Sequence, residues 1–287
     1  MKYESANRKN KFIEKYTYGS GITGFNEYVL RMVTSCPLGC AYCYLRGVNE
    51  KEAPKVYTNY EELKNEIYAL AESTKTELIK LNAGENADSL VFEPEAGLVN
   101  CLDEAVSGIQ NIKIELRTKT DNVECLKTLK NKNKFSLVFT ISPENIIQKY
   151  EKGTAPLLSR LEAVNKCLGW GFETGLRFEP IINTRAVSSD YAELIETIIE
   201  KTDFKNISSV GLSCLRLTGG LMEKMQGSAP ELLADEFVLC TDGKFRYFRP
   251  IRTRIYLNLI SLLNKHLPNT KVFLSSEPAY IWKDCGL

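Results

Sequence analysis

Short apolar or β-branched runs alternate with helical patterns along the chain, and this alternation restricts the fold more than any other feature of the sequence. The runs predict strands at about 28–35, 78–82, 112–117, 135–141, 173–182, 207–213 and 271–275. Between the strands, helical patterns lie at about 95–107, 121–130, 155–168, 190–201, 222–233 and 251–266. Strands that alternate with helices of this length predict an α/β protein with parallel strands, either a full or partial barrel or a doubly wound sheet.

One more helix is marked between the first two predicted strands. Thr58 and Glu61 have the spacing of a capping box. Leu63, Ile67 and Leu70 then repeat on one helical face. We therefore expect a helix that is capped by Thr58.

Composition excludes several classes of protein. The 37 basic and 36 acidic residues give a net charge of +1, so no global field favours nucleic acid or anionic membrane. The charged N-terminus is followed by no apolar run long enough for a membrane span or a signal peptide, and we expect a cytoplasmic protein. Nine cysteines without an export signal favour thiol or metal chemistry over disulfides. The single histidine, His266, excludes histidine-pair mechanisms and most zinc sites.

Polar residues follow several predicted strands, at the points where the strands end. These positions are the loop after 28–35, then 84–88, 118–119, 140–142 and 179–180. In a parallel α/β architecture the carboxyl ends of the strands gather at one edge, where active sites form. We expect these segments to line a shared pocket.

Three cysteines lie in the loop after the first predicted strand. Cys36, Cys40 and Cys43 have C-x3-C-x2-C spacing. Thiolates this close can wrap one inorganic cluster and ligate three of its four irons, which leaves the fourth iron open. The alternatives are a zinc site, which would need a fourth ligand absent from the loop, or three free thiols.

The cysteine loop resembles that of the radical S-adenosylmethionine superfamily, because an aromatic residue, Tyr42, precedes the third cysteine. The resemblance implies a [4Fe-4S] cluster and S-adenosylmethionine (SAM), which is cleaved reductively to a 5'-deoxyadenosyl radical. It further implies that Tyr42 lies against the adenine and that Glu85 holds the methionine ammonium. An external one-electron donor of the flavodoxin or ferredoxin type is implied as well.

More of the chain is similar to the spore photoproduct lyase family. The matching stretches are CPLGCAYCYL, GENADSL, LRTKTDNVECL, ISPENIIQKYEKGTAPLLSRLEA, DGKFRYFRPIRTRIY and VFLSSEPAYIW, between about residues 33 and 282. The resemblance implies cofactor contacts for Lys119, Thr140 and Ser142, and a role in radical relay for Tyr44.

The sequence departs from this family at one position. Where the lyase has a cysteine that returns a hydrogen atom to the product radical, this chain has Glu85. A carboxylic acid O–H bond is too strong for that task. Cys214, near the end of a predicted strand, is the best remaining thiol by location, whereas Cys101, Cys125 and Cys167 fall inside helical patterns and are expected in the core.

The segment 244–254 interleaves five basic residues with three aromatics. Arginines neutralise phosphates and aromatic rings stack on bases, so the segment suits a flipped or single-stranded nucleotide. The alternative is a hairpin arm whose arginines pair with local acids.

Together these features predict a partial (β/α)6 barrel of the TIM type, with parallel strands. We expect an N-terminal extension at 1–27, a radical SAM core at 28–215 and C-terminal elements at 216–287 that complete the domain. The predicted function is a radical SAM enzyme that acts on a nucleic acid lesion or modified base. A radical SAM enzyme that modifies a peptide or small metabolite, and a non-catalytic iron–sulfur protein, are the alternatives.

Overall fold

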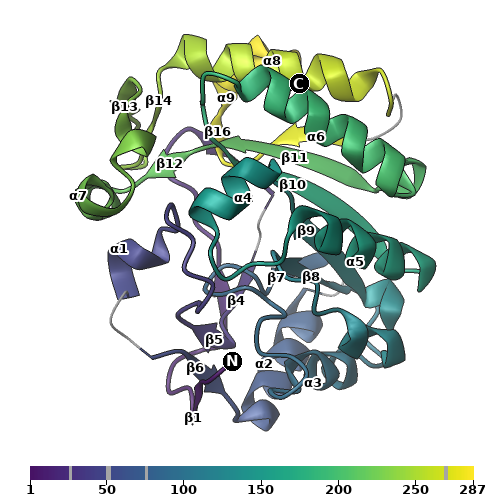
Figure 1. Ribbon diagram of the computed structural model, residues 1–287. Helices are drawn as coiled ribbons and strands as arrows, with labels where there is room; N and C mark the ends of the chain where they lie inside the picture. Colours follow the sequence, from purple (N-terminus) through teal and green to yellow (C-terminus); the bar gives the residue numbers. More distant parts are fainter. Residues whose placement is uncertain (26–27, 50–52, 75–76, 268–270) are drawn as a thin grey trace.

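A sheet of eight strands forms the centre of the chain, in a computed structural model that describes residues 1–25, 28–49, 53–74, 77–267 and 271–287 (Figure 1). Parallel neighbours follow one another across this sheet in chain order. They are β4 (Tyr28–Leu30), β7 (Ile79–Asn82), β8 (Ile112–Thr118), β9 (Phe135–Thr140), β10 (Glu173–Ile181), β11 (Ser209–Cys214) and β15 (Lys271–Leu274). A short strand, β2 (Ile13–Lys15), pairs antiparallel with β4 at one edge.

This strand order decides between the two architectures that the sequence allows. A doubly wound sheet reverses its strand order at a switch point, whereas a barrel keeps the order of the chain. The outermost strands, β2 and β15, do not pair with each other in the described part of the chain, so the barrel is open. The prediction of a partial parallel barrel is confirmed.

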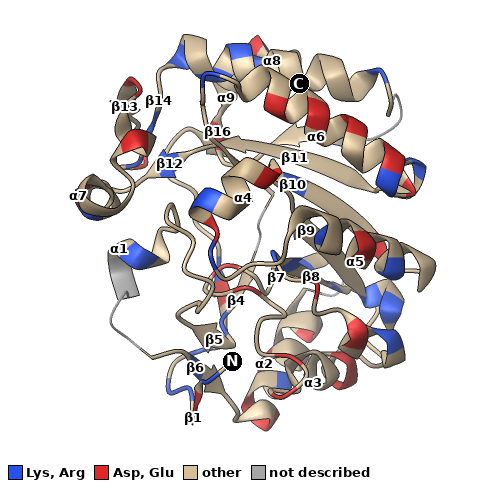
Figure 2. Ribbon diagram, in the orientation of Figure 1, with Lys and Arg blue, Asp and Glu red and all other residues tan. Residues whose placement is uncertain are grey.

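Helices cover the outer face of the curved sheet (Figure 1). The longer ones are α2 (Tyr60–Ser73), α3 (Leu98–Ala105), α5 (Leu157–Gly169), α6 (Val187–Lys201) and α8 (Arg249–Asn264). Figure 2 shows charged residues along several of these helices, such as α5 and α6. In α6, Tyr191, Leu194 and Ile198 are buried at helical spacing, which is the pattern that fixes a helix to a sheet.

Smaller sheets and short helices accompany the large sheet. One sheet joins β1 (Glu4–Ala6), β6 (Lys55–Tyr57) and β5 (Val33–Thr34), and another joins β12 (Arg216–Leu217), β14 (Phe245–Tyr247) and β13 (Phe237–Leu239). A third pairs β16 (Glu277–Pro278) with β3 (Ile22–Thr23). Short helices complete the set: α1 (Leu45–Asn49), α4 (Glu144–Tyr150), α7 (Gly219–Ser228), α9 (Ala279–Asp284) and the 3-10 turns η1 (Glu124–Thr128), η2 (Lys132–Lys134), η3 (Phe204–Asn206) and η4 (Pro230–Leu233). No helix in the described ranges is both long and apolar enough to cross a membrane.

Three local predictions differ from the structure. Thr58 does not cap α2: the N-cap is Asn59, whose side chain instead bonds the backbone of Arg8. The helix predicted at 121–130 is only the short 3-10 turn η1. The first predicted strand, 28–35, divides into β4 and β5, because the chain leaves the large sheet after Leu30 and β5 pairs with β6.

Candidate functional site

The cysteine loop, residues 35–44, lies between β5 and α1. Two of its residues, Ser35 and Gly39, have a φ of 64°. Only glycine adopts this left-handed backbone without steric cost, so Gly39 allows the sharp turn between Cys36 and Cys40. The loop therefore brings the three cysteines close together.

A cavity of about 300 Å³, the inner cavity, opens where the strands of the large sheet end. Nine of the ten residues that the sequence predicted for the site line it: Cys36, Cys40, Tyr42, Cys43, Tyr44, Glu85, Lys119, Thr140 and Cys214. Segments far apart in the sequence thus meet at the carboxyl ends of parallel strands.

Ser142 is the exception. It is fully buried, does not line the inner cavity, and its hydroxyl donates to the Glu151 carboxylate at 3.4 Å. The structure therefore places Ser142 behind the cavity wall, where it acts on Glu151.

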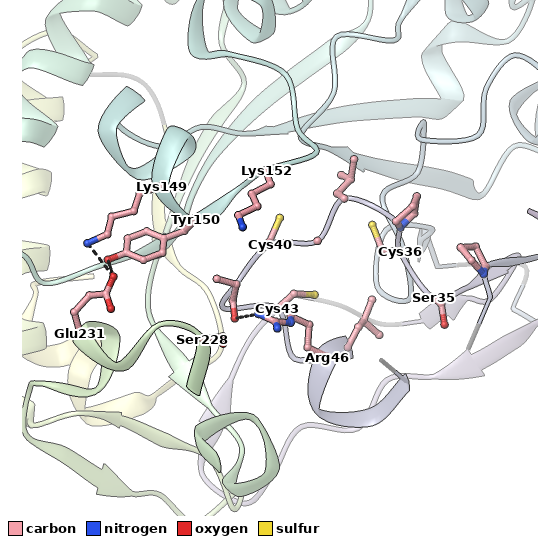
Figure 3. Close-up of a pocket in the computed structure, with 16 residues that line it drawn as sticks. Ser35, Cys36, Cys40, Cys43, Arg46, Lys149, Tyr150, Lys152, Ser228 and Glu231 are labelled. Carbon is pink, nitrogen blue, oxygen red and sulfur yellow. Dashed lines mark hydrogen bonds and ion pairs between the residues drawn. The ribbon is translucent and has the colours of Figure 1, made fainter. Parts of the chain in front are cut away.

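A second cavity, of about 660 Å³, meets the same three cysteines (Figure 3). Arg46, Lys149 and Lys152 line it, and Lys149 Nζ lies 2.9 Å from the carboxylate of Glu231. The cysteines consequently form a wall that the two cavities share.

The chemistry of the three thiols fits a cluster better than a single ion. Burial raises the pKa of Cys36 to about 11 and also raises the pKa values of Cys40 and Cys43, so all three are protonated thiols without a metal. No three histidine, cysteine or acidic side chains in the described segments are placed to hold one metal ion. Three thiols without a fourth donor suit a cluster that keeps an open iron.

Glu85 is held with its carboxylate toward the inner cavity. Asn82 Nδ2 donates to Glu85 Oε2 at 3.2 Å, and an Arg117 guanidinium nitrogen lies 4.0 Å from the same oxygen. The Tyr44 hydroxyl donates to the Glu85 carbonyl at 2.7 Å. A carboxylate fixed in this way can bind a cationic group of a ligand.

Asp88 is a site residue for which the sequence analysis proposed no role. Its carboxylate accepts the Lys119 N–H at 2.6 Å, the Thr118 hydroxyl at 3.0 Å and the Leu90 N–H at 2.9 Å. Burial raises the pKa of Asp88. The residue ties the loop after β7 to the end of β8, and the expected proximity of 84–88 and 118–119 was the signal that could have found it.

Three arginines and Glu179 line the inner cavity near β10, and Glu115 pairs with two of these arginines. Arg117 lies 2.5 Å from Glu115, Arg177 lies 3.5 Å from Glu115, and Arg216 lies 2.5 Å from Glu179. Burial opposes ionisation of Glu179, but Arg216 and Arg117 hold its pKa below the usual value. Arg177 and Glu179 both lie on β10, and each pairs with a residue of another strand.

The segment 244–254 matches the alternative that the sequence left open. Arg246 pairs with Asp242 through two contacts of 2.7 Å, and Arg252 pairs with Glu277.

Both of these arginines are fully buried, and Arg249 pairs with Asp284 at 2.6 Å. These arginines are therefore engaged by acids of the same chain, and the nucleotide surface predicted from them needs correction. Lys244 is the basic residue of this segment that lines the inner cavity.

The comparisons with known proteins agree with one another. The family model described as spore photoproduct lyase matches residues 21–216. The spore photoproduct lyase of Bacillus subtilis (strain 168) is 27% identical over 176 residues, which are 60% of this chain and 51% of the relative. That of Geobacillus sp. (strain Y412MC61) is 22% identical over 185 residues, 64% of this chain and 54% of the relative. The chain spans about half the length of the curated relatives it matches.

Solved structures show the same fold. A spore photoproduct lyase mutant with bound AdoMet and dinucleoside spore photoproduct has a TM-score of 0.81 at 19% identity, over 94% of this chain and 80% of that one. Streptococcus suis SuiB bound to S-adenosylmethionine has a TM-score of 0.57 at 13% identity, over 89% of this chain and 51% of that one. With a family model that matches well over half of its length, the chain belongs to the spore photoproduct lyase family.

Proposed function

We propose that the chain is a radical SAM enzyme that acts on a nucleic acid lesion or modified base. The observation that carries this proposal is the wall of three cysteines, which borders a cavity lined by the residues expected to bind SAM. In this proposal Cys36, Cys40 and Cys43 hold a [4Fe-4S] cluster. When bound, the cluster and SAM together supply a 5'-deoxyadenosyl radical that removes a hydrogen atom from the substrate.

The residues of the inner cavity bind and orient SAM. The Glu85 carboxylate takes the methionine ammonium, because Asn82 and Arg117 hold it from behind. Lys119 takes the carboxylate of the cofactor, with its ammonium 5.6 Å from the centre of the Tyr42 ring. Thr140, at the end of β9, contacts the ribose, and the Tyr42 ring lies against the adenine.

In this proposal Cys214 donates a hydrogen atom to the product radical, and Tyr44 takes part in relaying the radical. Both line the inner cavity, and Tyr44 is still 39% exposed. Burial raises the pKa values of the Tyr44 phenol and the Cys214 thiol well above neutral pH, so each keeps its proton. An O–H or S–H bond is what a hydrogen atom donor requires.

A nucleic acid substrate is supported by the solved relatives, which hold a dinucleoside spore photoproduct. Lys244 supplies a cation for a phosphate at the cavity. The alternative is a peptide or small metabolite, which the ion pairs of Arg246, Arg249 and Arg252 favour. The electron comes from an external donor of the flavodoxin or ferredoxin type.

Reconstitution with iron and sulfide tests the cofactor chemistry. With dithionite and SAM under anaerobic conditions, the wild-type chain should produce 5'-deoxyadenosine. Cys40→Ala should lower the yield by at least about 100-fold, because a cluster ligand is lost. Cys240→Ala removes a thiol that lines neither cavity and should leave the yield unchanged. Iron binding without any 5'-deoxyadenosine would instead indicate a non-catalytic iron–sulfur protein.

Binding to oligonucleotides over a salt series tests the substrate class. A nucleic acid enzyme should bind single-stranded DNA with an affinity that falls steeply with salt. Lys244→Ala should reduce the slope of log K against log salt by about 1, since one phosphate contact is lost. Arg249→Ala, which breaks an exposed ion pair, is the matched control. No binding at low salt would favour a peptide or small metabolite.

A further inference from the structure

A short segment after α4 holds the cysteine loop in place. In this bracket segment, residues 150–155, the Tyr150 carbonyl accepts a hydrogen bond of 2.8 Å from the Ala41 N–H. The Gly153 N–H donates to the Leu38 carbonyl at 3.0 Å. The cysteine loop is therefore bonded to a segment more than 100 residues later in the chain.

Glu151 lies at the centre of the bracket segment and is fully buried on its side chain. Its carboxylate accepts a hydrogen bond from the Tyr42 hydroxyl and lies 3.9 Å from Lys119 Nζ. Tyr42 belongs to the cysteine loop and Lys119 follows the end of β8. One carboxylate thus contacts both residues from behind the inner cavity.

Arg160 of α5 fixes this carboxylate. An Arg160 guanidinium nitrogen lies 2.5 Å from Glu151 Oε2, and the same guanidinium donates to the carbonyls of Ala155 and Thr140 at 2.8 Å. The guanidinium fork thereby also holds the end of β9. A buried charge of this kind is kept in place only when its partners are all present.

We infer that Glu151 is a positioning residue, which sets Tyr42 and Lys119 at the separation that SAM requires. The inference rests on the proposed function, since SAM is the ligand that the two side chains would contact. If Glu151 had a purely structural role, it would stabilise the fold, and removal of the Tyr42 hydroxyl would leave the affinity for SAM unchanged.

Tyr42→Phe is the variant that separates these roles. It keeps the ring for the adenine and removes only the hydroxyl that Glu151 holds. Glu151→Gln would leave Arg160 buried without its counterion and is expected to lose stability, so it serves less well. Tyr191→Phe is the control, because Tyr191 is equally buried, does not line either cavity, and has no hydroxyl partner among the described residues.

The measurement is the Kd for SAM of the reconstituted protein by calorimetry, beside the iron content of each variant. We expect Tyr42→Phe to weaken SAM binding about tenfold, as for a lost hydrogen bond to a charged group. The iron content should equal that of the wild type. The KM for SAM should rise, with little change in kcat. A Kd of Tyr42→Phe for SAM within about twofold of wild type, or a loss of affinity no greater than that of Tyr191→Phe, would overturn this inference but not the proposed function. A wild-type chain that binds iron but not SAM would overturn the proposed function and this inference with it.

Discussion

Among the described residues, Cys214 is the one cysteine outside the cysteine loop that lines the inner cavity. Its N–H donates to the Tyr256 hydroxyl at 2.7 Å, and that hydroxyl donates to the Glu277 carboxylate at 2.7 Å. The backbone at Cys214 is therefore held firmly, and the residue lines the cavity although it is only 1% exposed. The resemblance to the lyase family implies that Glu85 occupies the position of the family's hydrogen donor, and a carboxylate has no S–H bond.

Replacing Cys214 separates hydrogen return from SAM cleavage. Under the proposed function, with dinucleoside spore photoproduct as the probe, a wild-type chain that acts on it should release thymine product, and Cys214→Ala should lower that yield about tenfold, or about 1.4 kcal/mol. The yield of 5'-deoxyadenosine should stay at the wild-type level, since the substitution leaves the residues assigned to SAM binding in place. Cys285→Ala, a buried thiol outside both cavities, should change neither yield. Equal product from Cys214→Ala and wild type would make Cys214 an ordinary core thiol.

At the scale of elements, the bracket segment approaches the cysteine loop too closely for any side chain at Gly153. A Cβ at this position would lie 2.7 Å from the Leu38 carbonyl oxygen and 3.0 Å from its Cα. Both atoms are backbone, so neither can rotate away. The loop or the bracket segment must shift to admit a methyl group.

Gly153→Ala should therefore lower cluster loading. We expect about 1–3 kcal/mol of lost stability from overpacking, and at most about half of the wild-type iron per chain. Gly169→Ala, at the end of α5, meets nothing within 4 Å and is the control. Iron assay and thermal unfolding report the two effects, and unchanged iron in Gly153→Ala would mean that the loop adapts at no cost.

The strands of the large sheet are the elements that the sequence predicted best. Each of the seven predicted strands corresponds to a parallel strand of the large sheet, because buried apolar residues recur along each run. Helix ends were harder: the side chain of Asn59 is used by Arg8, which lies 51 positions away. No local pattern around Thr58 carries that information.

At the scale of the whole molecule, the same limit applies to the prediction of site residues. Lys119 and Thr140 could be predicted because parallel strands end at one edge. Glu151 and Arg216 could not, since their importance comes from contacts with Tyr42 and Glu179 that only the folded chain brings together. For the same reason the sequence left two interpretations of the arginines in 244–254 open, and the structure matches the one in which they pair with acids of the chain.

The N-terminal segment is an integral part of the fold. Residues 26–27 of the predicted extension 1–27 lie outside the described residues. Within the rest, β2 pairs with β4 of the large sheet, and Tyr16 lines the inner cavity. The large sheet thus takes strands from all three predicted parts of the chain, and the division at 27 and 215 stays a prediction.

Phe12 tests whether residues 1–27 belong to the cooperative unit. Its side chain is 1% exposed, and the N–H groups of Phe12 and Ile13 donate to the Glu66 carboxylate at 2.9 and 3.0 Å. Phe12→Ala should lower the free energy of unfolding by about 3–5 kcal/mol, as for a large aromatic removed from a core. Tyr68→Ala, at an aromatic side chain of α2 that is 45% exposed, should lower it by less than about 1 kcal/mol. Urea unfolding measures both, and a small loss in Phe12→Ala would show that the segment unfolds apart from the barrel.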